Sequence, residues 1–222
     1  MHVAVETAVR TLWPTASAAD ARMMARRFRD DPGRHFRAYT RGDLTFPQMR
    51  ARRVAELASW LGVALPAQGW EWFEAAYAPA FTAALTVYAD VRPAIATLRG
   101  VGLAVGVLTN SSADYTSQKL TAAGLDALFD IVVTRDTLGV GKPDRRVFDH
   151  ACALLGDPPA RVAYVGDEYD VDPLAARAAG LQGIWLRRPG DVADPADLAD
   201  ATARGIPVVA SLADLGPLVA GR

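Results

Sequence analysis

The chain has 222 residues, of which 51% are hydrophobic, and its formal net charge is −1 at pH 7. This composition is typical of a globular protein with one sizeable domain, or with a core and a smaller second domain. The balanced charge argues against general binding to nucleic acid, and no apolar run approaches the roughly 20 residues of a membrane span. The single cysteine, Cys152, excludes an intramolecular disulfide and favours a cytoplasmic location.

Residues 3–85 are expected to be helical, because apolar residues recur there at three- and four-residue spacing. Pro14 should end the first helix, and Ser17 with Asp20 resembles the capping box of a second. An aromatic stripe repeats at helical spacing further on, and we expect it to pack between helices rather than to line a pocket. Its members are Trp70, Phe73, Tyr77 and Phe81.

From residue 88 onward, short apolar runs alternate with helical patterns, which predicts an α/β fold with a doubly wound parallel sheet. The expected strands are 103–108, 130–134, 161–165, 182–186 and 207–210. The expected helices are 113–123, 144–155, 173–179 and a last one from residue 211. We therefore expect a helical domain over residues 1–87 and an α/β domain over residues 88–222.

An apolar run at 162–165 leads directly into Gly166 and Asp167, and a second carboxylate, Asp172, follows before the next helix. The run predicts a strand buried on both faces, so both acids lie at the carboxyl end of a parallel strand, where open α/β sheets bind ligands. Two converging carboxylates repel each other unless a cation or a proton lies between them, which favours a Mg²⁺ site. The alternative is a solvated loop with a helix-capping aspartate.

Two other strand ends carry groups suited to phosphate. The run 103–108 ends in Thr109 and Asn110 before a helix, which places a hydroxyl and backbone N–H groups at a potential anion site. Lys142 lies in a Gly-Lys-Pro loop before another helix, and only it and Lys119 are lysines among the 24 basic residues. A compact ammonium fits between a carboxylate and a phosphate where a planar guanidinium does not, although a surface lysine is the alternative. Together these groups predict phosphoryl chemistry.

Three motifs in this order resemble those of the haloacid dehalogenase (HAD) superfamily. They are Leu108-Thr109-Asn110, Gly141-Lys142-Pro143, and Gly166-Asp167 followed by Asp172. The resemblance covers roughly residues 86–219, and the helical segment before them is similar to the family's cap. It implies a HAD-like Rossmannoid core, which is a doubly wound parallel sheet, with an all-helical cap.

The resemblance implies a Mg²⁺-dependent phosphatase that acts on a small phosphomonoester. From the balanced charge and the short apolar runs, we expect no binding to nucleic acid or to a membrane. Thr109 would hold the phosphoryl oxygens with Asn110 beside it, and Lys142 would neutralise the nucleophile and the phosphate. Asp167 would ligate Mg²⁺, and Asp172 would ligate the ion or orient its water.

Two alternatives remain on the sequence alone. One is a 2-haloacid dehalogenase-like hydrolase, which needs no metal, and the other is a catalytically inactive HAD-like protein with a binding or regulatory role. Glu168, next to Asp167, is a weaker candidate ligand for the metal. The sequence indicates neither the substrate nor the oligomeric state.

One departure from the family concerns its first motif, a strand ending in Asp-x-Asp-x-Thr whose first aspartate is the nucleophile. None of the early aspartates follows an apolar strand: Asp20, Asp30 and Asp31. In the family that strand lies between the strands ending here at Leu108 and Val165. Without it these would lie ~10 Å apart instead of ~4.8 Å, with unpaired edges. We therefore expect that the natural protein begins upstream of Met1 or that something else fills the space, and that this 222-residue chain by itself has little phosphatase activity.

Overall fold

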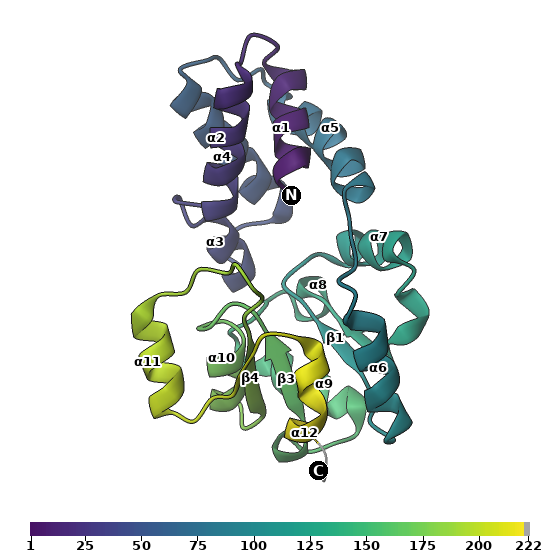
Figure 1. The fold of residues 1–222 in the computed structure, drawn as a ribbon. Coiled ribbons are helices and arrows are strands. Elements are labelled where there is room, and N and C mark those ends of the chain that lie inside the picture. The colour runs from purple at the N-terminus through teal and green to yellow at the C-terminus, as the bar shows by residue number, and fades with distance from the viewer. Residues whose placement is uncertain (220–222) are drawn as a thin grey trace. The chain divides into compact units, whose positions relative to one another are not determined.

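The computed structural model of the chain describes residues 1–219, and these residues form two compact units (Figure 1). The first unit contains residues 1–86 and 117–123, and the second contains residues 87–116 together with those from 124 onward. Among residues 1–219, no helix has the length and apolar character needed to cross a membrane.

The first unit is entirely helical, and its helices begin and end at the signals in the sequence. Its elements are α1 (His2–Leu12), α2 (Ala18–Asp30), α3 (His35–Arg41), α4 (Phe46–Leu61) and α5 (Gly69–Ala83). The Ser17 hydroxyl accepts a hydrogen bond from the Asp20 backbone N–H at 3.1 Å, and the Asp20 carboxylate accepts one from the Ser17 N–H, which completes the predicted capping box. Gly62 ends α4 in the left-handed conformation at φ 66°.

The aromatic stripe packs inside the first unit, as the sequence predicts. Phe28 on α2 stacks against Phe73 on α5 with ring centroids 5.6 Å apart. Phe73 then stacks on Tyr77 at 5.8 Å, and Phe73 is fully buried. Arg53 also lies inside this unit, with its guanidinium 3.7 Å from the Phe28 ring centroid and its Nε 3.4 Å from Asp31 Oδ1. Burial lowers the pKa of Arg53 to about 10.

The second unit alternates strands and helices, which gives the predicted α/β class. Its strands are β1 (Gly106–Leu108), β2 (Ile131–Val133), β3 (Ala163–Gly166), β4 (Gln182–Leu186) and β5 (Val208–Val209). Its helices are α6 (Val91–Gly100), α7 (Ala113–Ala123), α8 (Arg135–Leu138), α9 (Arg145–Leu155), α10 (Pro173–Ala178), α11 (Pro195–Ala203) and α12 (Gly216–Val219). Short 3₁₀ turns occupy Asp126–Leu128, Pro159–Arg161 and Leu212–Leu215. α7 extends into the segment 117–123 that clusters with the first unit.

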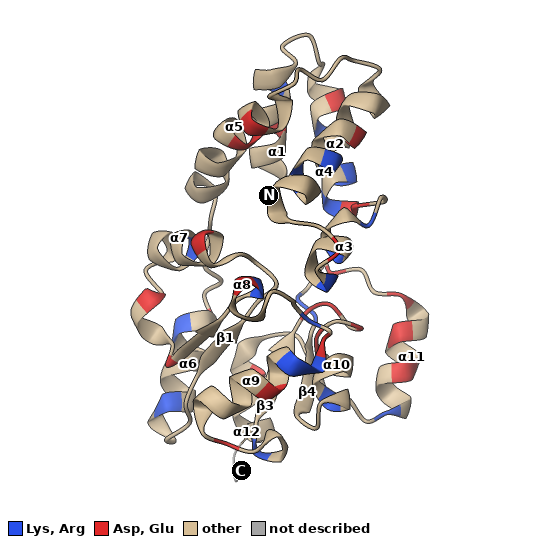
Figure 2. Cartoon of the chain, turned by 180° about the vertical axis from the view of Figure 1, so that it is seen from behind, with Lys and Arg blue, Asp and Glu red and all other residues tan. Residues whose placement is uncertain are grey.

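All strand pairs are parallel, but the strands form two separate sheets, β1–β2 and β3–β4–β5. Helices α9 and α10 cover one face of β3 through Phe148, Ala176 and their neighbours, which contact Val162 and Tyr164. The opposite face carries Ala163 and Val165 and packs with residues of α6 and α12. In the described part of the chain, none of the strand residues is charged, and Figure 2 draws the strands without blue or red. This helix–sheet–helix layering is the doubly wound arrangement that the sequence predicts.

β1 and β3 face each other across an apolar cavity of about 420 Å³, here named the interstrand groove. Residues 104–108 line one side and residues 161–165 line the other, with apolar side chains of α6, α9 and α12 completing the walls. Within the described residues, β1 pairs only with β2, and β3 pairs only with β4. The groove therefore lies where the HAD resemblance places a strand that is not found among residues 1–219.

Candidate active site

Polar side chains converge in the second unit at the carboxyl ends of β1 and β3. Lys142, in the loop before α9, and Asp172, at the start of α10, form an ion pair with 2.5 Å between Nζ and Oδ1. Lys142 is only 8% exposed and Asp172 only 2% exposed, so the two charges neutralise each other away from solvent. The predicted cation and one predicted carboxylate are thus brought together.

The backbone around Gly166 shapes the position of Asp172. Asp172 Oδ2 accepts a hydrogen bond from the Glu168 backbone N–H at 2.9 Å. A Cβ atom at position 166 would lie 2.3 Å from Asp172 Cγ, so only glycine lets the carboxylate lie against the end of β3. Because Oδ1 pairs with Lys142 and Oδ2 accepts from Glu168, both carboxylate oxygens of Asp172 already have partners in the protein.

Tyr164 on β3 is a site residue that the sequence reasoning missed. Its hydroxyl accepts a hydrogen bond from Lys142 Nζ at 2.7 Å. The same hydroxyl lies 3.1 Å from the Leu108 carbonyl oxygen and 3.2 Å from Asp172 Oδ1, either of which can accept its proton. Burial and the nearby Asp172 carboxylate raise the pKa of Tyr164 well above its usual value, so the phenol stays protonated. The sequence signal that could have identified Tyr164 is its polar hydroxyl inside an otherwise apolar strand.

Asn110 connects the end of β1 to the lysine loop. Its side-chain amide donates to the Lys142 carbonyl at 3.0 Å, and its carbonyl oxygen accepts from the Lys142 backbone N–H at 2.6 Å. This two-way bond fixes the loop, so Asn110 positions Lys142 through the backbone. Thr109 Oγ1 accepts from the Ser111 N–H at 3.1 Å, which places its hydroxyl in the turn before α7.

Asp167 presents an exposed carboxylate at the end of β3 and forms no ion pair with residues 1–219. Its backbone carbonyl accepts a hydrogen bond from Trp185 Nε1 at 3.0 Å, which anchors the main chain to β4. Partial loss of hydration, followed by the negative charge of Asp172, raises the pKa of Asp167 above its usual value. A cation bound beside Asp167 would relieve this repulsion.

The carboxylates at this site are better suited to a Mg²⁺ ion that is shared with the substrate than to a metal ion fully enclosed by protein ligands. Among residues 1–219, no cluster of three or more His, Cys, Asp or Glu side chains is placed to hold a metal. Mg²⁺ is commonly bound by one or two carboxylates, with waters and phosphate oxygens completing its octahedron. Asp167 with Asp172 beside it meets that requirement.

The early aspartates are engaged within the first unit. Asp20 caps α2, Asp30 pairs with Arg29 at 2.8 Å, and Asp31 pairs with Arg53 at 3.4 Å. Cys152 is buried on α9, and burial raises the pKa of its thiol, so it is a core residue rather than a nucleophile. The identity of the attacking group stays a prediction from the family resemblance.

The chain belongs to the haloacid dehalogenase-like hydrolase family, whose pattern matches residues 4–180. It is thus a HAD-like hydrolase by family, with the α/β core and helical segment typical of that fold. Both the phosphatases and the dehalogenases of this family are found among its relatives.

Phosphoserine phosphatase of Thermus thermophilus is 37% identical over 109 residues, which are 49% of this chain and 44% of that protein. (S)-2-haloacid dehalogenase of Pseudomonas fluorescens is 30% identical over 131 residues, which are 59% of this chain and 55% of that protein. These matches cover about half the length of the curated relatives. The HAD-hydrolase YfnB from Bacillus subtilis, solved with magnesium, superposes with a TM-score of 0.75 over 97% of this chain and 91% of that one. At 16% identity, this likeness shows the fold alone.

Proposed function

We propose that the chain forms the cap and core of a Mg²⁺-dependent phosphatase that hydrolyses a small phosphomonoester. The observation that carries this proposal is the buried ammonium of Lys142, held 2.5 Å from Asp172 at the carboxyl ends of two parallel strands. A fixed cation with neighbouring carboxylates at that edge of the sheet is suited to a doubly charged phosphate.

Each site residue has a defined task in this proposal. The Thr109 hydroxyl and the backbone N–H groups after it hold the phosphoryl oxygens, because they lie in the turn that begins α7. Lys142 balances negative charge where nucleophile and phosphate approach, and Asn110 holds its loop in place. Asp167 would hold a Mg²⁺ ion, and Asp172 would be a second ligand or would orient water beside it. When bound, the ion would supply positive charge that stabilises the phosphoryl oxygens.

The names of the relatives support a small phosphorylated substrate, since phosphoserine phosphatase and phosphoglycolate phosphatase are among them. The attacking group is proposed to be an aspartate that follows a strand lying between β1 and β3. The test uses the chain extended at its N-terminus by an apolar strand ending in Asp-x-Asp-x-Thr. It measures phosphate release from p-nitrophenyl phosphate and from phosphorylated two- and three-carbon acids, with Mg²⁺ and with EDTA. Release that depends on Mg²⁺ supports the proposal, and release unaffected by EDTA contradicts it.

A second candidate is a 2-haloacid dehalogenase. The observation that favours it is the Lys142–Asp172 pair, which balances charge at the site without a metal ion. The relative named (S)-2-haloacid dehalogenase agrees with this possibility. Chloride release from 2-chloropropionate in EDTA distinguishes it from the phosphatase. If no form of the protein releases phosphate or halide, both enzymatic proposals fail, and the remaining hypothesis is a catalytically inactive HAD-like binding protein.

A further inference from the structure

Lys142 and Tyr164 meet at the end of β3, and the two side chains differ in how firmly the fold holds them. The ammonium of a lysine lies at the end of a flexible four-carbon stem, so the backbone alone does not determine its position. The hydroxyl of a tyrosine lies on a rigid ring with only two side-chain torsions, so its position follows closely from the backbone. The contact therefore joins a flexible side chain to a rigid one.

Tyr164 is fixed by its strand, by its ring and by its hydroxyl. Its backbone lies in β3, aligned with Gly183 of β4. Its ring meets Phe148 of α9 nearly edge-on, with the centroids 5.3 Å apart and the ring planes at 87°, and Phe148 is fully buried. Its hydroxyl lies 3.1 Å from the Leu108 carbonyl oxygen, which belongs to β1 in the other sheet. The hydroxyl is thus held in place by contacts that do not involve Lys142.

The Lys142 ammonium has two acceptors within residues 1–219. Nζ donates to Asp172 Oδ1 at 2.5 Å and to the Tyr164 hydroxyl at 2.7 Å. An ammonium carries three N–H donors in a tetrahedral arrangement, so two fixed acceptors also determine the direction of the third N–H. If Asp172 were the only acceptor, the group would be free to turn about that one hydrogen bond. The Tyr164 hydroxyl therefore adds the second point that a defined orientation needs.

The hydroxyl of Tyr164 is better explained by Lys142 than by the packing of the strand. A phenylalanine ring at position 164 would make the same edge-on contact with Phe148 and would need no hydrogen-bond partner. Of the three contacts that the hydroxyl makes, the one with Lys142 Nζ is the shortest, at 2.7 Å against 3.1 and 3.2 Å. The main partner of this hydroxyl is therefore the ammonium.

Asp172 is less suited than Tyr164 to fix the ammonium by itself, because its carboxylate has other partners. Its Oδ2 already accepts a hydrogen bond from the Glu168 backbone N–H at 2.9 Å. In the proposed function the same carboxylate also ligates Mg²⁺ or orients its water, so a bound cation would compete with Lys142 for its oxygens. A phenol hydroxyl is not among the oxygen ligands that Mg²⁺ commonly takes, so the bond from Lys142 to Tyr164 would persist.

We propose that Tyr164 is a positioning residue, whose hydroxyl together with Asp172 orients the Lys142 ammonium and aims its third N–H at the ligand of this site. The proposal rests on the proposed function, in which that ligand is the phosphoryl group and the carboxylate that attacks it. Tyr164 itself acts through Lys142 and touches no reacting atom. The orientation of the ammonium is a property of the 222-residue chain, however, and it is measured without any substrate.

The composition of the chain makes this orientation measurable, because Lys119 and Lys142 are its only lysines. The experiment labels both lysines with ¹⁵N in the 222-residue chain and uses NMR relaxation to measure the order parameter of each Cε–Nζ bond. We expect a value above about 0.8 for Lys142, comparable to rigid backbone, and a value below about 0.6 in Tyr164→Phe. The value for Lys119 should be the same in both proteins.

Tyr77→Phe is the matched control, because it removes the hydroxyl of another buried tyrosine, in the first unit. It should leave the order parameter of Lys142 at the value of the unmodified chain. Circular dichroism checks that both variants are folded, so a change confined to Tyr164→Phe reports the lost contact with the ammonium and not a general loosening of the protein.

Kinetics in the form extended by a strand ending in Asp-x-Asp-x-Thr measure what the orientation contributes to the reaction. Tyr164→Phe should lower kcat by about tenfold or more and change KM less than about threefold. The reason is that the charge of Lys142 remains near the bound phosphate, whereas its aim at the transition state is lost.

A mobile Lys142 ammonium in the unmodified chain would overturn the proposal, whether or not Tyr164→Phe folds. An order parameter that Tyr164→Phe leaves unchanged would overturn it too, as would an unchanged kcat of this variant in an active extended form. If the extended form itself releases no phosphate, the phosphatase function fails, and loosening of the ammonium in Tyr164→Phe still supports the positioning role. Loosening together with the loss in kcat supports both.

Discussion

Lys142 Nζ lies 2.5 Å from Asp172 Oδ1, and the two side chains are 10% and 4% exposed. The pair joins the loop before α9 to the turn before α10, and Tyr164 completes a triangle of polar groups at the end of β3. A buried cation without its partner is unfavourable by several kcal/mol, so the pair fixes where the ammonium can lie. The site therefore presents a charge whose position is set before substrate arrives.

The first prediction concerns the shape of this cation. Lys142→Arg keeps the charge, but a guanidinium is longer and planar and cannot occupy the space between Asp172 and Tyr164. We expect kcat/KM to fall by ~10²-fold or more, about 2.7 kcal/mol of transition-state stabilisation, in a form of the protein extended by an N-terminal strand ending in Asp-x-Asp-x-Thr. Steady-state kinetics on the two variants Lys142→Arg and Lys119→Arg checks this.

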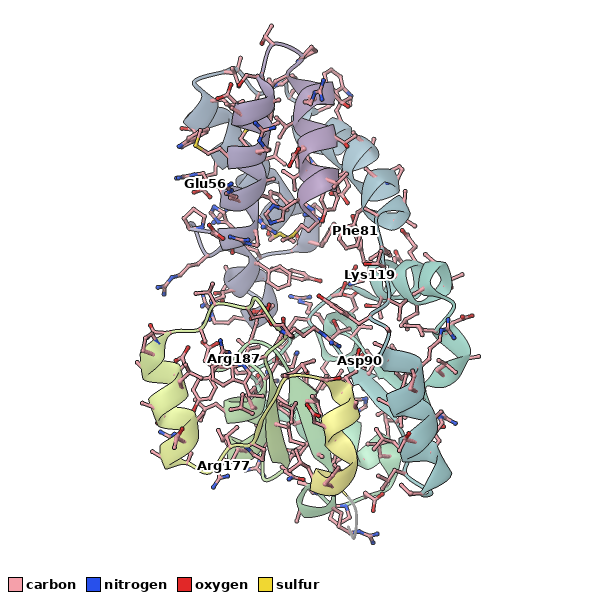
Figure 3. All side chains as sticks on the ribbon, viewed as in Figure 1. Glu56, Phe81, Asp90, Lys119, Arg177 and Arg187 are labelled. Atoms are coloured by element: carbon pink, nitrogen blue, oxygen red, sulfur yellow. The ribbon has the colours of Figure 1, made fainter. Side chains whose placement is uncertain are left out.

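Lys119, labelled in Figure 3, is the matched control because it is the other lysine of the chain. It is partly buried, and burial lowers its pKa, so the comparison is between two desolvated lysines. We expect almost no loss of kcat/KM at position 119. Equal losses at both positions would remove Lys142 from the catalytic site.

The second prediction is that Asp167 dominates Mg²⁺ binding. Asp172 already accepts hydrogen bonds on both oxygens, whereas Asp167 forms no ion pair among residues 1–219. Asp167→Asn should weaken Mg²⁺ binding at least tenfold by calorimetry, while Glu168→Gln should change it less than threefold. Unchanged affinity in Asp167→Asn would refute the assignment.

The third prediction concerns stability without metal. The pKa of Asp167 is raised in the folded protein, so folding favours its protonated form, and the ionised carboxylate destabilises the fold. This destabilisation is absent well below pH 4, develops as pH rises through the folded pKa, and is complete above it. Asp167→Asn should therefore raise Tm at pH 7 in EDTA, and the gain should vanish near pH 3. A lower Tm at pH 7 would contradict this explanation.

The fourth prediction concerns Asp90, which lies just before α6 and is labelled in Figure 3. Its carboxylate accepts hydrogen bonds from both terminal nitrogens of Arg188 at 2.9 and 3.1 Å. Ser211 Oγ and the Leu212 N–H add two more at 2.7 and 2.9 Å. The Arg188 bonds, foremost among these interactions, hold the pKa of Asp90 well below its usual range.

Because the folded pKa of Asp90 is depressed, its stabilisation is present above about pH 4 and is lost as pH falls below that value. Asp90→Asn should destabilise the second unit by about 2 kcal/mol at pH 7, a Tm decrease of roughly 4–8 °C. The difference from the unsubstituted chain should shrink between pH 4 and pH 2. Asp126→Asn, at an exposed position, is the control and should leave Tm nearly unchanged. A difference that does not depend on pH would contradict the ion-pair explanation.

Much of the fold follows from local patterns in the sequence. The predicted strand 182–186 and helix 113–123 coincide with β4 and α7, because unbroken apolar or amphipathic runs end there at clear signals. Other strands are shorter than predicted: the run 103–108 forms β1 only over its last three residues. The last helix, expected from residue 211, begins as a 3₁₀ turn at Leu212 and becomes α-helical at Gly216.

The site itself was only partly predictable. Strand ends and helix starts indicate Thr109, Lys142 and Asp167, because each signal lies within a few residues. The role of Tyr164 depends on how β1 and β3 are spaced, and the clamp between Asn110 and Lys142 joins segments 32 residues apart. Such relationships arise from tertiary packing and have no local signature.

The most direct test of the account measures phosphate release from a small phosphomonoester by two forms of the protein. One is the 222-residue chain, and the other carries in addition an N-terminal apolar strand ending in Asp-x-Asp-x-Thr. We predict turnover far below ~1 s⁻¹ for the first form and Mg²⁺-dependent turnover for the second, lost again in its Asp167→Asn variant. Turnover near ~1 s⁻¹ by the 222-residue chain, or halide release in place of phosphate release by the extended form, would contradict the proposed phosphatase function.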